Sequence, residues 1–251
     1  MSETSNIAAL NEWYQKPVGT ALLQSELGGL ASVLPQIFGY YIMQIGGPIN
    51  NDEVLATSHI HNHIIVNPNA LSPSNDSLAV QCQLDELPFL PDSIDAAVLF
   101  HVLEFAQNPK AILKEIYTAL IPNGYAIIFG FNPCSLWGMA SLWQKQKEVP
   151  WFGNWISPGH MRHLLDEIGF SIGDYKTFYF RPPSTNPEQL LFMEGLGQIF
   201  WPYCGASYML VAQKTLTTLT PIRPLFSLVK YFKAAKALPK PARSSQCNNK
   251  N

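Results

Sequence analysis

The sequence predicts an α/β protein with a doubly wound, mostly parallel sheet of seven strands. Three observations predict this class: short apolar runs alternate with helical patterns, turn residues separate them, and several runs have no polar face. Residues 96–100 are such a run, typical of a parallel strand buried on both faces. The chain has 251 residues, 47% of them hydrophobic, which is enough for one domain with a sizeable core.

The apolar runs predict where the strands lie, and we expect the last strand to be antiparallel to its neighbours. The predicted strands are residues 40–45, 63–66, 78–82, 96–100, 125–131, 170–180 and 207–212. The connections after the first and second strands are short, and residues 67–76 include two prolines. We therefore expect shortened early helices.

Helix signals lie around and between these runs. Leucines at helical spacing in residues 20–35 predict an amphipathic helix with one buried face. Asn108-Pro109 begins a helix that we expect to close at Asn123-Gly124. Ser157-Pro158 begins another, which closes at Gly169, and Asn186-Pro187 leads a further helix.

Charge is distributed unevenly along the chain. Residues 214–251 contain eight basic residues and no acidic one, so the rest carries eight basic and eighteen acidic residues. Within this tail, residues 225–238 are compatible with a basic amphipathic helix that contacts anionic lipid or nucleic acid, or with a solvated tail, which we favour.

Sequence features also bear on location. We find neither a leader pattern nor an apolar run of membrane-spanning length, and the four cysteines are scattered. We expect a cytoplasmic protein with reduced thiols and without stable membrane insertion.

The most informative segment is residues 84–131. Its motifs are Leu87-Pro88-Phe89, Asp92-Ser93-Ile94-Asp95, an apolar run ending at His101, Asn108-Pro109, and Leu120-Ile121-Pro122-Asn123-Gly124. In order and spacing this segment resembles the type 11 domain of class I S-adenosylmethionine-dependent methyltransferases, a group that includes ubiquinone-biosynthesis C-methyltransferases. The resemblance implies a Rossmann-like sheet, S-adenosyl-L-methionine as cofactor and a small-molecule substrate.

A closer likeness is to a small, poorly characterised proteobacterial group of methyltransferase-like proteins. It rests on Trp13, Pro17 and Gly19 ahead of Glu26, on Phe38-Gly39-Tyr40, and on Gly130-Phe131-Asn132-Pro133 with Ser135-Leu136 and Gly138. We divide the chain into an N-terminal helical segment (1–36), a methyltransferase-like domain (37–213) and the basic tail (214–251).

The cofactor motifs of the family are degenerate in this chain. Gly46 and Gly47 stand where the family has a glycine-rich turn that lets the backbone approach the cofactor, and the alternative is a simple turn. Asn67 replaces the carboxylate that holds the ribose hydroxyls, or only forms a turn with Pro68. Gln83, beside Leu84, replaces the acidic residue that contacts the adenine amino group.

Three further residues are candidates near the methyl group and its acceptor. His101 follows the fourth strand and is a candidate general base with a near-neutral pKa, or a residue that only shapes the cavity. Asn132 and Trp137 follow the fifth strand, in a segment with three more tryptophans. That segment is either a substrate lid or an aromatic packing loop.

The alternating His59, His61 and His63 would share one face of a strand, but no carboxylate or cysteine pattern accompanies them. We assign no metal site to them. The leading hypothesis is a methyltransferase acting on a small molecule. The alternative hypotheses are a catalytically inactive binding or scaffold protein that has lost the cofactor, and a membrane- or nucleic-acid-associated regulator that uses the tail.

Overall fold

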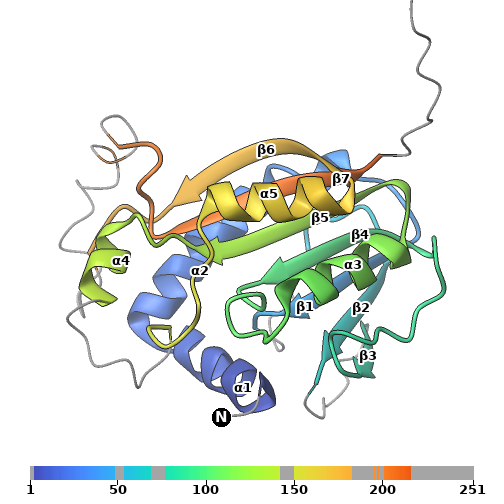
Figure 1. The fold of residues 1–251 in the computed structure, drawn as a ribbon, viewed down its shortest axis with the longest axis horizontal. Helices are drawn as coiled ribbons and strands as arrows, with labels where there is room; N and C mark the ends of the chain where they lie inside the picture. The colour runs from blue at the N-terminus through green and yellow to red at the C-terminus, as the bar shows by residue number, and fades with distance from the viewer. Residues whose placement is uncertain are drawn as a thin grey trace, which may run out of the picture. The chain divides into compact units, whose positions relative to one another are not determined.

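The computed structural model describes residues 3–48, 54–68, 77–141, 150–182, 195, 197 and 201–215. These residues form one seven-stranded sheet in the order β3-β2-β1-β4-β5-β7-β6 (Figure 1). The strands are β1 (Tyr41–Gly46), β2 (Asn62–Asn67), β3 (Ser77–Gln81), β4 (Ile94–Phe100), β5 (Leu120–Phe131), β6 (Phe170–Phe178) and β7 (Ser207–Lys214). Only the pairings of β7 with β5 and β6 are antiparallel, which confirms the predicted sheet.

The centre of the sheet is buried on both faces, as the apolar runs predict. All seven residues of β4 are buried, and β4 pairs in parallel with β5. Successive side chains of β4 alternate between two core clusters: Ala97 and Leu99 belong to one, and Val98 and Phe100 to the other. This alternation follows from the twofold period of a strand.

Two capped helices cover one face of the sheet (Figure 1). Helix α3 (Pro109–Ala119) begins where the Asn108 side chain accepts a hydrogen bond from the Ala111 amide, at 3.1 Å. Helix α5 (Pro158–Ile168) has Ser157 as its N-cap and ends at Gly169, with a φ of 111°.

The predicted end of helix α3 at Asn123-Gly124 is wrong. The helix ends at Ala119 because Leu120 is already extended, and Asn123 takes its left-handed φ of 65° inside β5.

The N-terminal segment contributes two helices and a short 3-10 turn (Leu34–Gln36). Helix α2 (Pro17–Ala31) includes most of the predicted leucine helix and lies on the face opposite α3 and α5 (Figure 1). Helix α1 (Glu3–Tyr14) was not predicted. It joins the two core clusters, because Ile7 packs in the cluster of Ala97 while Leu10 and Trp13 pack in the other.

The last strand, β7, extends two residues beyond its predicted end at residue 212, and therefore one residue beyond the predicted domain boundary at residue 213. Lys214 lies at the end of β7, and its ammonium group donates to the Asp92 carboxylate at 2.7 Å and to the Leu120 carbonyl at 2.6 Å. Residues 216–251 lie outside the described residues. So does the start of the helix expected at Asn186-Pro187; beyond it only residues 195 and 197 are described, and both are helical. No helix in the described part is long and apolar enough to cross a membrane.

Candidate active site

The carboxyl ends of β1, β2 and β4 meet at one edge of the sheet. In the register, Gly46 lies opposite Phe100, the residue before His101, and Ile45 lies opposite Val66, the residue before Asn67. Ligands of open α/β sheets bind at this edge, near the point where the strand order reverses. The topology therefore brings Gly46, Asn67 and His101 to the same edge.

Glycine is required at the turn after β1. Gly46 and Gly47 have φ values of +69° and +74°, in the left-handed region that disfavours other residues. A Cβ atom on Gly46 would lie 2.3 Å from Cγ2 of Val102, and one on Gly47 would lie 2.9 Å from the Phe100 ring. Glycine is thus needed because the backbone of this turn packs closely against the end of β4. That backbone forms part of the surface at the carboxyl edge of the sheet.

Two amide side chains, Asn67 and Gln83, lie near the ends of β2 and β3, where the sequence resemblance implies carboxylates. Asn67 ends β2 and is fully buried. Leu84 is buried, whereas Gln83 is exposed. A turn from Gln83 to Glu86, closed by a 3.4 Å backbone hydrogen bond, follows β3 and includes Asp85. Asp85 is therefore not on a continuous strand with Gln83.

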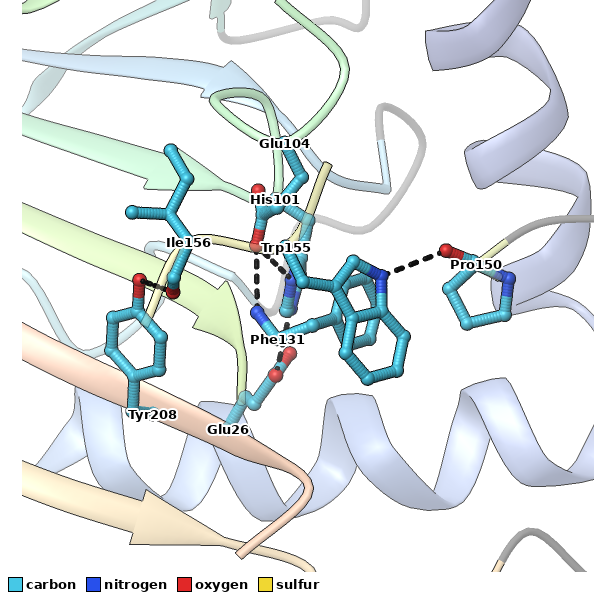
Figure 2. A network of polar contacts seen from close by, with 8 residues as sticks. All are labelled: Glu26, His101, Glu104, Phe131, Pro150, Trp155, Ile156 and Tyr208. Atoms are coloured by element: carbon cyan, nitrogen blue, oxygen red, sulfur yellow. Dashed lines mark hydrogen bonds and ion pairs between the residues drawn. The ribbon is translucent and has the colours of Figure 1, made fainter. Parts of the chain in front are cut away.

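His101 lies between two buried carboxylates (Figure 2). Its Nε2 is 2.9 Å from Oε1 of Glu26, which α2 contributes, and its Nδ1 is 3.4 Å from Oε1 of Glu104. The same Oε1 of Glu104 accepts a 2.6 Å hydrogen bond from the Phe131 amide at the end of β5. All three side chains are at most 1% exposed, so the ion pairs are screened from solvent.

The environment of His101 sets its protonation state. Burial lowers the pKa of the imidazole, but the carboxylates of Glu26 and Glu104 outweigh burial and raise the pKa to about 9. The expectation of a near-neutral pKa is wrong for this structure. With this pKa the ring is an imidazolium at neutral pH. Its Nε2 donates a hydrogen bond to Glu26, its Nδ1 faces Glu104 in an ion pair, and the ring cannot accept a further proton.

His101 also has an unusual backbone. Its φ of +50° is uncommon for a residue with a side chain, and its amide donates to the Phe129 carbonyl at 3.2 Å. The bend directs the chain from β4 into a turn in which the Phe105 amide donates to the Val102 carbonyl. Glu104 lies within this turn, three residues after the histidine, and so reaches the same ring.

Tyr14 completes the buried polar cluster from α1. The side chain is 2% exposed, and its ring centroid lies 6.4 Å from that of His101. Burial, Glu26 and Glu104 raise the pKa of the phenol well above its ordinary value, so the hydroxyl stays protonated at physiological pH. We define the buried polar cluster as Tyr14, Glu26, His101 and Glu104.

Sequence reasoning assigned no role to Tyr14, Glu26 or Glu104. One signal was present for Glu26. It lies on the leucine-rich face of its helix, four residues after Leu22 and four before Leu30, both fully buried. A carboxylate within an apolar stripe is rarely solvated, and it indicates a buried partner.

Asn132 has a positioning role in this structure. Its side-chain amide donates to the carbonyls of Tyr203 and Gly205 at 2.8 and 3.0 Å, and its oxygen accepts from the Cys134 amide at 3.0 Å. The residue is 1% exposed. These bonds join the end of β5 to the segment before β7.

Trp137 lies on the short helix α4 (Leu136–Ser141) and is 1% exposed. Its ring packs against Trp13, Phe131 and Tyr179, with centroid distances of 5.5 to 6.4 Å. Of the two interpretations of this segment, these contacts favour aromatic packing. Trp143 lies outside the described residues.

A pocket of about 470 Å³ lies beside this aromatic group, between the starts of α3 and α5. Its lining includes Asn154, Trp155 and Pro133. Trp155 stacks on Phe131 at 5.1 Å, and the Asn154 amide donates to the Glu104 carbonyl at 2.8 Å. The pocket is therefore separated from the buried polar cluster by the Trp155–Phe131 pair and the Glu104 backbone.

The three alternating histidines do not share a strand face. Only His63 lies in β2, and its Nε2 is 2.7 Å from the Ile60 carbonyl oxygen. His59 stacks on Phe38 at 5.4 Å, and His61 is exposed. The described residues contain no group of His, Cys, Asp or Glu arranged to hold a metal ion.

Comparison with known proteins identifies the class. Residues 58–128 match a family model described as a methyltransferase domain. The structure is similar to a Haloferax volcanii protein assigned as a methyltransferase and solved with the Trm112 methyltransferase activator, with a TM-score of 0.62, 14% identity, and coverage of 86% of this chain and 98% of that one. It is also similar to a Thermotoga maritima S-adenosylmethionine-dependent methyltransferase described as a possible histamine N-methyltransferase, with a TM-score of 0.61, 20% identity, and coverage of 84% and 98%.

Residues 58–128 thus match a methyltransferase domain, and the described residues have the fold of the class I S-adenosylmethionine-dependent methyltransferases. S-adenosylmethionine is the cofactor that this domain and this fold class indicate. Within the class, the chain is similar to the Escherichia coli (strain K12) protein YafS, described as uncharacterized, with 25% identity over 219 residues that cover 85% of each chain.

Proposed function

We propose that this protein is an S-adenosylmethionine-dependent methyltransferase that acts on a small molecule. The observation that carries the proposal is the meeting of the Gly46-Gly47 turn with the buried polar cluster at the carboxyl edge of a methyltransferase sheet. The first feature is a backbone surface suited to a cofactor. The second is a charged centre beside it.

The residues at this edge are placed where they could contact the cofactor. Asn67 and Gln83 each offer one side-chain acceptor oxygen, where a carboxylate would offer two. The backbone of Gly46 and Gly47 would underlie the methionine portion, Asn67 would accept one ribose hydroxyl, and Gln83 with Leu84 would flank the adenine. When bound, S-adenosylmethionine supplies a methyl group activated by its positive sulfur. His101 and its two carboxylates would line the methyl side.

The role of this chain's own residues is then mainly positional. Holding two reactants in line removes much of the entropic barrier to methyl transfer. Rigid surfaces on either side of the reactants are therefore sufficient for catalysis. The turn at Gly46 and the ion-paired His101 are both rigid, because each is fixed by backbone geometry and buried contacts. Asn132 and Trp137 support the His101 side of the site by their packing. Because both are buried, we do not expect them to contact substrate, in contrast to the expectation from the sequence.

Calorimetric titration with S-adenosylmethionine and S-adenosylhomocysteine tests the proposal. Gln83 is exposed, so Gln83→Ala leaves the core intact and should weaken binding by about 3- to 10-fold through loss of one hydrogen bond. Glu86→Ala, an exposed change at the other end of the same turn, is the matched control and should leave binding unchanged.

Gly46→Leu is a poor probe of binding, because its Cβ would collide with Val102 of the protein itself. If the folded wild-type protein gives neither heat nor thermal stabilisation at millimolar cofactor, the alternative takes its place: a methyltransferase-fold binding or scaffold protein. The cytoplasmic location and the lipid or nucleic-acid contacts of the tail remain hypotheses for separate experiments.

A further inference from the structure

The buried polar cluster contains more hydrogen-bonding atoms than it satisfies. Four of these atoms are buried without a hydrogen-bond partner among the described residues. One is Nδ1 of His101, which lies 3.4 Å from Oε1 of Glu104, and three are oxygens: the Tyr14 hydroxyl and the Oε2 atoms of Glu26 and Glu104. The three residues are 2%, 0% and 3% exposed. Leaving such atoms unpaired is costly, so a native protein generally pairs them with another group.

The charge of the buried polar cluster is also unbalanced. Two carboxyl groups face a single imidazole ring, so acidic groups outnumber basic ones in a region shielded from solvent. A group that balances this excess must be cationic, and to satisfy the unpaired oxygens it must carry N–H donors. An ammonium group has three donors and one positive charge.

Aromatic rings adjoin the same place. Phe131 packs on His101 with ring centroids 3.8 Å apart, and the Tyr14 ring, on α1, lies 6.4 Å from the histidine ring. The faces of such rings attract cations, most strongly where water is excluded. Carboxylates and aromatic rings together are the chemistry by which proteins recognise amines.

We propose that the methyl acceptor of this protein is an amine, whose ammonium group pairs with the unpaired carboxylate oxygens of the buried polar cluster, beside His101, before methyl transfer. This inference rests on the proposed function and names its substrate class. His101 and Glu104 follow β4 directly, at the edge where the cofactor's methyl group would lie.

The reaction balances with these groups. One carboxylate takes a proton from the ammonium, and the freed nitrogen lone pair bonds to the methyl carbon as the carbon–sulfur bond breaks and leaves its electron pair on sulfur. The products are an N-methylated ammonium and S-adenosylhomocysteine. The carboxylate then releases its proton to solvent. The imidazolium of His101 pairs with both carboxyl groups and holds them in place, which makes it a positioning residue.

Thermal unfolding with methylammonium chloride as the probe tests the inference on the full chain. Potassium chloride at equal ionic strength controls for salt, and tetramethylammonium chloride provides a cation without N–H donors. Methylammonium should raise the melting temperature by about 2–4 °C more than either control at saturation. Glu104→Gln should abolish this difference, whereas Glu167→Gln, an exposed carboxylate paired with Lys110, should retain it.

A second measurement needs no variant. The ring resonances of His101 should move on addition of methylammonium and stay in place with tetramethylammonium. Equal responses to all three salts would overturn the inference, because water alone then satisfies the unpaired oxygens.

Titration with S-adenosylhomocysteine on the same samples separates the two proposals. Heat with this ligand but no methylammonium effect leaves the proposed function intact and overturns the amine acceptor. No heat with it overturns the proposed function, and the acceptor role with it. Simultaneous binding of both ligands supports the inference. Mutually exclusive binding would assign the buried polar cluster to the cofactor's own ammonium group and overturn it.

Discussion

Oε1 of Glu26 lies 2.9 Å from Nε2 of His101, and this contact joins the N-terminal helix α2 to the end of β4 across 75 positions of sequence. Both side chains are fully buried. The N-terminal helices therefore form part of the candidate site. A charged ligand bound at the carboxyl edge would therefore interact electrostatically with Glu26 of α2 as well as with His101.

Glu26→Gln should lower the pKa of His101 from its value of about 9, because it removes one of the two carboxylates that raise it. We expect a loss of about 1–3 kcal/mol in the free energy of unfolding at pH 7, since a hydrogen bond to a charged group is replaced by a neutral one. An NMR titration of the histidine ring and urea unfolding measure the two effects. Glu12→Gln, an exposed change on α1, should alter neither. An unchanged His101 pKa would contradict the pairing.

Stability should fall as the pH rises from about 6.5 to about 9. The folded-state pKa of His101 is raised above the ordinary value of 6.5, so the folded protein binds this proton more tightly than the unfolded chain. The contribution is fully present below pH 6.5 and is lost as the pH passes through 9, and it amounts to about 3 kcal/mol at most.

Urea unfolding across this pH range measures the slope, and His101→Asn isolates it, because asparagine tolerates the left-handed backbone of this position. The variant should lack the decline between pH 6.5 and 9. A decline of the same size in both proteins would show that other groups cause it.

Two glycines should respond oppositely to alanine. Gly46→Ala should lower the free energy of unfolding by about 2–4 kcal/mol, because it combines a left-handed φ with a Cβ placed 2.3 Å from Val102. Gly28→Ala should raise it by about 1 kcal/mol, since Gly28 lies inside α2 and a Cβ there meets nothing within 4 Å. Chemical unfolding of the two variants checks the pair, and equal effects would show that the turn after β1 is less constrained than this structure has it.

Asn67→Asp should tighten the binding of S-adenosylhomocysteine by about 10- to 100-fold. A carboxylate at the end of β2 can accept both ribose hydroxyls, and charge-assisted hydrogen bonds of this kind contribute about 1.5–3 kcal/mol. Calorimetry compares the two proteins, and circular dichroism confirms that the buried charge has not unfolded the variant. Equal or weaker binding by a folded Asn67→Asp would show that this position does not hold the ribose.

The fold was predictable because its signals are local. Ala97 and Leu99 mark a strand with two buried faces by their composition alone, and Asn108 and Ser157 mark helix starts by their side-chain oxygens. Helix α1 was missed because its apolar residues Ile7, Leu10 and Tyr14 are few, and the helix depends on packing between the two core clusters.

The carboxyl edge itself could also be anticipated, since each parallel strand ends in a residue that the chain order identifies. Gly46, Asn67 and His101 were identified through the resemblance to the methyltransferase motifs, and the strand register places all three at this edge. The partners of His101 were not, because Glu26 reaches it only when α2 packs against the sheet and Glu104 only when the chain turns sharply after β4. The sequence by itself determined where the strands lie along the chain, that the sheet is mostly parallel, and the edge where chemistry belongs. Tertiary structure alone decided the charge at that edge, because burial and proximity, which no local pattern records, raise the pKa of His101.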